Sequence, residues 1–379
     1  MLGHAGPQAF QIGLGVAILW DNGRELAGIA LDAAPQLAVY APVPFSISPR
    51  AAALPCLRPG AWINSLLSLG SHNSYRPELD GAGLIQQRQR LGDHAAGVEY
   101  GHPAIARQLD LGVRQVEFNP YADTLGGRFA ALHAQDPARL SIMNRPVAKV
   151  LHAPLVDACR LCLTLEDCFS QVNVWSRAHP DHALMVIFVN TKDDGFKNPA
   201  IPDPEPYTET SLAVIDASAL AVFGRDRIVT PDTVRGSAAT LREAVLNGDW
   251  PSQTSARGKV LLVLDSNPRV SELYCLGHPS LRGRVMFGLY DAARPEAAIF
   301  SIQNPLAEEA RIKALVAQGF SVRTRSDADT REARAHDLSR LAAAERSGAQ
   351  IISADYYPGA PDPLGLKFVV RPAFFDTAH

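Results

Sequence analysis

The sequence predicts an α/β protein, a TIM (β/α)8 barrel with some distortion from the regular pattern. Three observations predict this fold. Short apolar runs recur along the chain, helix-like segments lie between several of them, and many of the runs end in a polar residue. Runs rich in Val, Ile and Leu without strict alternation are typical of strands buried on both faces. Strands that alternate with helices form a parallel sheet through right-handed crossovers.

Nine runs are candidate strands, whereas a barrel needs eight. The runs at 285–290 and 299–304 are separated by only the eight residues DAARPEAA, too few for a helical crossover. We therefore expect one of these two runs to lie outside the barrel. The other candidate strands are 66–70, 113–119, 148–153, 184–190, 259–265, 320–325 and 349–355, and the clearest helix-like segments are 164–179, 237–248, 306–319 and 327–348.

The chain has 379 residues, of which 47% are hydrophobic and 20% charged, an ordinary globular composition. We expect residues 58–379 to form the barrel domain and residues 1–57 to form an N-terminal extension. The apolar run Ala9–Trp20 is too short to span a bilayer. It has the length of a signal h-region, but no Lys or Arg precedes it. An ordinary strand or helix, or a wrongly assigned start, is favoured over an export signal.

Charge limits the partners that the sequence predicts. The formal net charge is −3, and no cluster of Lys and Arg indicates a nucleic-acid surface. No transmembrane segment and no amphipathic docking segment stands out, so we expect any membrane contact to be peripheral. The Pro-rich stretch 198–207 is interpreted as a long excursion from the barrel.

Three of the five cysteines, Cys159, Cys162 and Cys168, lie close together in the sequence. A zinc site would need a fourth ligand, and no Cys or His pair with finger spacing follows. A local disulfide that uses Cys168 is favoured over three buried thiols or a metal site. A disulfide points to an oxidising compartment, so a secreted or periplasmic location is expected rather than a cytoplasmic one.

Polar side chains follow many of the predicted strands at their carboxyl ends. In an α/β barrel, this end holds the active site. Two histidines can act as a general acid and a general base, or one can donate a proton while the other stabilises developing charge. Amide and carboxylate oxygens suit Ca²⁺ or Mg²⁺, and cationic side chains suit an anionic phosphodiester. The set therefore indicates phosphodiester cleavage, and its members are His72, Asn73, Glu117, Asn119, His152, Asn190, Lys192, Asp265, Arg323, Arg325 and Asp355.

The sequence also resembles the bacterial and fungal Ca²⁺-dependent phosphoinositide phospholipases C. The resemblance covers roughly residues 58 to 371 and lies in several motifs that occur in order. They include GSHNSY (70–75), GVRQVEFNPYAD (112–123), KVLHAPLVD (149–157), RGKVLLVLD (257–265) and SGAQIISADYY (347–357). It implies a phospholipase C-like phosphodiesterase barrel in which the inositol 2-hydroxyl attacks phosphorus and the lipid alcohol leaves.

The resemblance also implies roles for individual residues. His72 resembles the histidine that contacts the phosphoryl group, and His152 resembles the general acid. Asn73, Glu117, Asn119 and Asn190 resemble a Ca²⁺ cradle, with Glu117 as the candidate base. The remaining substrate contacts are expected from Lys192, Asp265 and Arg323.

Two departures from the family pattern weaken the metal prediction. Asn119 stands where the family has Asp, and Asn190 stands where eukaryotic relatives have Glu. Each keeps a carbonyl oxygen but removes a charge, so metal should bind more weakly, or not at all, unless Asp265 or Asp123 compensates.

Several readings stay open at this stage. A glycerophosphodiester-type hydrolase that activates water, or a non-catalytic phosphate-binding barrel, would also fit. One of Arg323 and Arg325 is expected to contact phosphate, unless they pair with Asp327 or Asp329. Glu117 is alternatively an ion-pair partner of Arg114 or of another barrel cation. Loop and turn roles are expected for His179, His182 and Gly126–Gly127.

Overall fold

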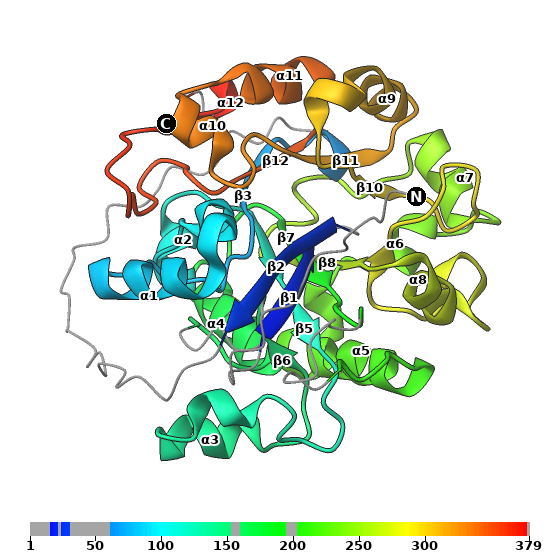
Figure 1. Ribbon diagram of the computed structural model, residues 1–379. Helices are drawn as coiled ribbons and strands as arrows, with labels where there is room; N and C mark the ends of the chain where they lie inside the picture. The colour runs from blue at the N-terminus through cyan, green and yellow to red at the C-terminus, as the bar shows by residue number, and fades with distance from the viewer. Residues whose placement is uncertain (1–15, 22–23, 31–60, 153–159, 195–202, 377–379) are drawn as a thin grey trace, which may run out of the picture.

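The structure is a computed structural model that describes residues 16–21, 24–30, 61–152, 160–194 and 203–376. Eight short strands form one parallel sheet in the order β10-β11-β12-β3-β4-β7-β8-β9. The sheet curves into a barrel, with most of the helices arranged around it (Figure 1). Its strands are β3 (Ser68–Ser71), β4 (Gln115–Phe118), β7 (Met185–Asn190), β8 (Val260–Asp265), β9 (Phe287–Gly288), β10 (Ile299–Ser301), β11 (Ser321–Arg325) and β12 (Ile351–Ala354). The predicted α/β barrel is confirmed.

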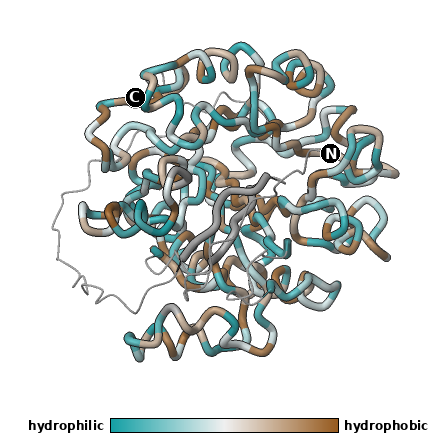
Figure 2. The backbone as a smooth tube through the Cα atoms, viewed as in Figure 1, coloured by the Kyte–Doolittle hydropathy of each residue, from teal (hydrophilic) through white to brown (hydrophobic). Residues whose placement is uncertain are grey.

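The helices connect the strands and cover the outside of the barrel. Side-chain caps such as Thr164, Thr208 and Thr240 start several of them, and left-handed glycines such as Gly248 and Gly348 end some of them. Hydrophilic and hydrophobic residues alternate along these helices, as expected when one side packs on the sheet (Figure 2). None of the described helices is long and apolar enough to cross a membrane. The helices are α1 (Gly81–Leu91), α2 (Ile105–Asp110), α3 (Pro137–Met143), α4 (Leu165–Ala178), α5 (Glu209–Phe223), α6 (Pro231–Arg235), α7 (Leu241–Asn247), α8 (Pro268–Cys275), α9 (Pro305–Ala317), α10 (Arg331–Ala335), α11 (Ser339–Ser347) and α12 (Ala373–Asp376).

The segment predicted as one helix before the last strand is in fact two, α10 and α11. They are separated because His336 adopts a left-handed conformation, with φ of 50°. Short 3-10 turns complete the described elements, at Ile63–Ser65, Gly92–Val98, Ala130–His133, Arg225–Arg227 and Pro279–Leu281.

One of the nine candidate strands lies outside the barrel, but it is not one of the two that the sequence indicated. Both 285–290 and 299–304 contribute barrel strands, β9 and β10, so the expectation that one of them lies outside is wrong. These strands are only two and three residues long, so the chain can return between them without a helix. The strand outside the barrel is β6 (Lys149–Val150), which pairs antiparallel with β5 (Pro120–Tyr121).

The barrel closes weakly between its two edge strands. Within the described chain, β9 and β10 are joined by a single parallel bridge, between Leu289 and Ile299. By contrast, β7 and β8 pair along their whole length, from Met185–Val260 to Asn190–Asp265. The sheet is therefore a barrel with a seam.

The interior of the barrel is polar beneath its carboxyl end. Gly70 on β3 faces Gln115 on β4 so closely that an added Cβ would lie 1.9 Å from the amide oxygen of Gln115. That amide oxygen accepts a hydrogen bond from Ser353 of β12, whose hydroxyl also accepts one from Nε of Arg323 at 2.8 Å. A glycine is needed at position 70 because this polar layer occupies the space of a side chain.

Residues 16–30 form a separate antiparallel pair, β1 (Val16–Asp21) and β2 (Arg24–Ala30). The end of the apolar run at 9–20 is therefore a strand, while its first residues lie outside the described chain.

Candidate active site

A polar cavity lies at the carboxyl ends of the barrel strands. Nine of the eleven residues that the sequence predicted at the carboxyl ends of the strands line it, and the exceptions are Arg323 and Asp355. The strand-end argument therefore brings together side chains that are up to 253 positions apart, from His72 to Arg325. The lining residues are His72, Asn73, Glu117, Asn119, His152, Asn190, Lys192, Asp265, Gln303 and Arg325.

A tight turn after β3 presents His72 and Asn73 to the cavity. Asn73 adopts a left-handed conformation with φ of 48°, which asparagine tolerates better than most residues. The hydroxyls of Ser71 and Ser74 lie 2.6 Å apart, and the hydroxyl of Ser74 accepts from the backbone N–H of Glu117 at 2.8 Å. The serines therefore fix the turn and anchor it to β4.

The ring of His72 is held from three sides. Its Nδ1 lies 3.1 Å from Oδ1 of Asp355 and 3.1 Å from the hydroxyl of Tyr100. Its Nε2 lies 3.4 Å from Nη1 of Arg325. His102 supports the same residue, because its Nε2 lies 2.7 Å from the His72 carbonyl. The imidazole is partly exposed but has little freedom to rotate.

The carboxylate behind His72 is buried among other charges. Asp355 follows β12 and accepts from Nη2 of Arg325 at 2.8 Å. Burial raises the pKa of Asp355, and Arg325 opposes that rise. Asp327 accepts from the backbone N–H groups of Asp355 and Tyr356, and burial together with the nearby Asp355 charge raises its pKa further. The arginines of β11 thus do not form the ion pairs with Asp327 and Asp329 that the sequence suggested.

His152 reaches the cavity from a segment outside the barrel sheet. It follows the β5–β6 ribbon, and its carbonyl accepts from the hydroxyl of Tyr121 at 3.1 Å. The backbone N–H of the preceding Leu151 donates to the carbonyl of Asn119 at 3.2 Å. The expectation that His152 ends a barrel strand is therefore wrong, although its place in the lining agrees with the prediction.

Glu117 lies at the cavity floor, and its side chain is only 1% exposed. Nη2 of Arg323 donates to its Oε2 at 2.5 Å, and Nδ2 of Asn190 donates to its Oε1 at 3.3 Å. Burial alone would raise the pKa of Glu117, but Arg323, His72, Lys192 and Arg325 together lower it to about 2. The alternative that Glu117 pairs with a barrel cation is confirmed, and such a carboxylate is a weak base.

Arg323 does not line the cavity, contrary to the prediction that it contacts substrate. Its side chain is 1% exposed and crosses the barrel interior beneath the cavity floor. Arg323 and Arg325 alternate on β11, and Arg325 is the one closer to the carboxyl end. Arg325 is therefore the β11 arginine available to a bound anion.

The three asparagines are linked mainly to protein groups. Asn73 donates from Nδ2 to the hydroxyl of Tyr100 at 2.8 Å, and its Oδ1 accepts from Nδ2 of Asn119 at 2.9 Å. Oδ1 of Asn119 is buried without a protein hydrogen-bond partner among the described residues. This amide oxygen is therefore available to a ligand or a water.

Two site residues carried no assigned role in the sequence prediction. Gln303 lines the cavity two residues after β10, so the strand-end rule was sufficient to find it. Tyr100 lies in a loop after a 3-10 turn, and no local pattern marks it as a partner of His72. Asp123, considered as a compensating ligand, instead pairs with the buried Lys149 at 2.9 Å.

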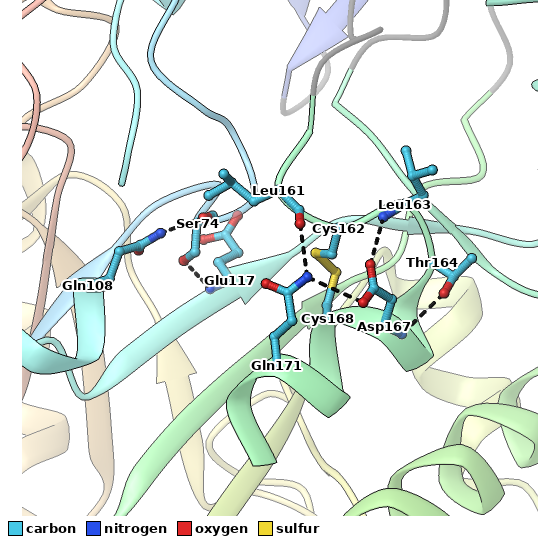
Figure 3. Close-up of a disulfide and its surroundings, with 10 residues drawn as sticks. All are labelled: Ser74, Gln108, Glu117, Leu161, Cys162, Leu163, Thr164, Asp167, Cys168 and Gln171. Atoms are coloured by element: carbon cyan, nitrogen blue, oxygen red, sulfur yellow. Dashed lines mark hydrogen bonds between the residues drawn. A yellow bond between two sulfur atoms is a disulfide. The ribbon is translucent and has the colours of Figure 1, made fainter. Parts of the chain in front are cut away.

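The predicted disulfide is confirmed and joins Cys162 to Cys168 at the start of α4. Figure 3 shows the bridge beside Gln171, whose Nε2 donates to the carbonyl of Leu161 at 2.9 Å. The N–H of Leu161 in turn donates to the carbonyl of Tyr75, next to the turn that carries His72. The bridge therefore stabilises a loop that supports the cavity, while Cys159 lies outside the described residues.

The other expectations for loop residues are also confirmed. His182 is buried between the hydroxyl of Ser176 and the carbonyl of Ala183, and the ring of His179 stacks on Trp175. Both glycines of the pair 126–127 have positive φ and form a turn.

The barrel and its cavity of histidines, cations and a buried carboxylate define the class of this protein, an α/β-barrel enzyme. The family model for Ca²⁺-dependent phosphoinositide phospholipase C matches residues 62–372. The chain belongs to this family. No curated protein sequence matches it.

Solved structures of bacterial enzymes share the fold. One is a calcium-dependent phosphoinositol-specific phospholipase C from Pseudomonas sp., at 16% identity and a TM-score of 0.52, covering 86% of this chain and 100% of that chain. Another is a Ca²⁺-dependent phosphatidylinositol-specific phospholipase C from Streptomyces antibioticus, at 19% identity and a TM-score of 0.51, covering 81% and 98%. At these identities the likeness is one of fold.

The family description implies Ca²⁺, and the residues at the cavity fit this ion poorly. Ca²⁺ takes six to eight oxygen ligands, several of them carboxylate. Here both oxygens of Glu117 accept from protein donors, and Oδ1 of Asn73 accepts from Asn119, so these ligand oxygens are already engaged. Among the described residues, no cluster of three or more His, Cys, Asp or Glu side chains is placed to hold a metal.

Proposed function

We propose that this protein cleaves inositol-containing phosphodiesters, of the phosphatidylinositol type, at the cavity. The observation that carries the proposal is that His72 and His152, from separate parts of the chain, line one polar cavity together with Lys192 and Arg325. Two imidazoles suit proton transfer to and from two oxygens of one phosphorus centre. Two cations beside them suit the negative charge of a phosphodiester.

The proposed reaction is an internal displacement. The inositol 2-hydroxyl oxygen forms a bond to phosphorus, and the bond from phosphorus to the leaving alcohol breaks. His152 donates a proton to the leaving oxygen, so the alcohol departs neutral. Arg325 and Lys192 stabilise the charge on the non-bridging oxygens. The product is an inositol cyclic phosphate.

His72 is the better base for the attacking hydroxyl. With its Nδ1–H donating to Asp355, its Nε2 is the unprotonated nitrogen, which lies 3.4 Å from Nη1 of Arg325 and accepts the proton of the attacking hydroxyl. Glu117, the base expected from the sequence, has both oxygens engaged by Arg323 and Asn190. We therefore assign Glu117 a structural and electrostatic role at the cavity floor.

A substrate panel followed by phosphorus NMR tests the proposal. Phosphatidylinositol, glycerophosphoinositol and glycerophosphocholine would each be incubated with the purified protein in Ca²⁺, in Mg²⁺ and in chelator. A transient cyclic phosphate from an inositol substrate is the expected result. Turnover without a cyclic phosphate would support the glycerophosphodiester-type reaction, and binding without turnover would support a phosphate-binding barrel.

We also propose that the protein works in a secreted or periplasmic location, supported by the buried Cys162–Cys168 disulfide. Fractionation of cells that produce the full chain would test this. Recovery of the protein solely in the cytoplasm with both thiols reduced would contradict it.

A further inference from the structure

The side chain of Arg323 stands where the cavity floor would otherwise concentrate negative charge. It extends from β11 under the cavity and donates from Nη2 to Glu117 on β4 at 2.5 Å. Its Nη1 lies 4.0 Å from Oδ2 of Asp265 on β8. One guanidinium thus lies close to carboxylates of two separate strands.

Further contacts fix Arg323 in this position. Nε donates to the hydroxyl of Ser353 at 2.8 Å, and Nη1 lies 3.4 Å from the hydroxyl of Ser301. The guanidinium carbon lies 5.0 Å from the centre of the Phe188 ring. A planar, always charged group held by hydrogen-bond acceptors on both edges and by an aromatic ring is a permanent part of the interior.

The charges at the cavity show what this arrangement achieves. Without Arg323, the carboxylates of Glu117 and Asp265 would be two anions without that cation beside them, in the lining of a cavity that also contains the amides of Asn119 and Asn190. That combination would attract a divalent cation. With Arg323 present, a fixed cation already compensates them, and a bound divalent ion would be repelled by Arg323 and by Lys192.

We propose that Arg323 is the resident cation of this site, in place of Ca²⁺, and that the chain acts on its phosphodiester substrate without a divalent metal. Arg323 is a positioning residue, because it does not line the cavity. It holds Glu117 as a charged acceptor for Asn190 and keeps the floor of the cavity ordered. The claim that the chain turns over its substrate without a divalent metal rests on the proposed function. The claim that Ca²⁺ does not bind can be tested by itself.

The first test uses the unmodified protein. Calorimetric titration with Ca²⁺ is expected to show no stoichiometric binding at about 1 mM, the weak end of protein calcium sites. Turnover of phosphatidylinositol in chelator is expected to stay within about 2-fold of its rate in Ca²⁺, far less than the loss expected when a catalytic metal is removed. Stoichiometric Ca²⁺ binding, or turnover that chelator abolishes and Ca²⁺ restores, would overturn the inference and leave the proposed function intact.

The second test removes the charge of Arg323 and asks whether the cavity then binds Ca²⁺. Arg323→Met removes the charge at similar length and should create Ca²⁺ binding, seen as a melting temperature that rises with added Ca²⁺. The double variant Arg323→Met/Glu117→Gln is the matched control, because it lacks both the cation and its main anion and should show no such rise. If both variants gain Ca²⁺ binding alike, or if neither does, Arg323 is not what excludes the ion.

The outcomes separate the two proposals. Failure of every substrate under every condition would overturn the proposed function, and the Ca²⁺ titration of the unmodified protein would still decide the metal question. If Arg323→Met does not fold, Arg323→Lys retains the charge and should remain insensitive to chelator. A requirement of Arg323→Lys for Ca²⁺ would also contradict the inference.

Discussion

The imidazole of His72 and the carboxylate of Asp355 form a pair at the edge of the cavity, with Nδ1 and Oδ1 3.1 Å apart. The residues lie 283 positions apart in the sequence but follow neighbouring strands, β3 and β12. The second oxygen of the same carboxylate accepts from Arg325 at 2.8 Å. Asp355 therefore sets the positions of both His72 and Arg325, the proposed proton-transfer group and the proposed phosphate-binding cation.

Asp355→Asn should lower kcat on phosphatidylinositol by at least about 10-fold, because His72 loses the anion that orients its ring and stabilises its protonated form. Steady-state kinetics would measure the loss, with KM expected to change less. Asp329→Asn is a matched control, since Asp329 pairs with the exposed Arg331. A variant that folds normally and keeps the wild-type pH profile would contradict this role for Asp355.

His72→Ala and His152→Ala should each reduce turnover by at least about 10²-fold if these groups transfer protons. Initial rates on an inositol phosphodiester would show the effect. His179→Ala provides the comparison, because this histidine stacks on Trp175 and does not line the cavity. Rates unchanged in both cavity variants would remove the basis for the reaction proposed above.

Replacing both cysteines of the bridge, Cys162→Ala and Cys168→Ala, should lower the free energy of unfolding by about 2 kcal/mol. This is the loop-closure estimate for a short loop, and the two cysteines are six positions apart. Chemical unfolding with and without reductant would measure it. Reductant should destabilise the unmodified protein but leave the double variant unaffected, and equal sensitivity of the two would argue against the bridge as the cause.

Acid should destabilise the protein through His182. Burial is the main cause that lowers its pKa from an ordinary value near 6.5 to about 4. Between these values the unfolded chain binds a proton that the folded state does not, so the free energy of unfolding falls as the pH falls. The loss is about 3 kcal/mol by pH 4.

His182→Gln should remove part of that dependence, measured as the slope of unfolding free energy against pH from 7 to 4. A residual slope is expected because burial and nearby arginines also lower the pKa of His133 to about 4. The same slope in variant and parent would exclude His182 as a source of acid sensitivity.

Much of this architecture could be predicted because its signals are local. Apolar runs such as those around β3 and β7 mark buried strands, and a polar residue directly after a run marks the working end of the barrel. This rule alone places His72, Glu117 and Asp265 at one cavity, without any knowledge of pairing between strands.

The remaining features depend on contacts that no local pattern encodes. A short apolar run does not reveal its neighbour, so β6 could not be distinguished from β9 or β10. Arg323 and Arg325 are two positions apart on one strand, so both side chains point to the same face. Which of them lines the cavity depends on its distance from the carboxyl end of the barrel. Tyr100 reaches His72 from a loop, and its role follows only from the packed structure.

A single bridge, from Leu289 to Ile299, joins β9 to β10, so the barrel is held together less firmly there than between β7 and β8. Amide protons on either side of this edge should exchange with deuterium before those of β7 and β8, because fewer hydrogen bonds must break to expose them. The same place is the natural one to cut and rejoin the polypeptide in a circular permutant, since new ends there would interrupt almost none of the ladder.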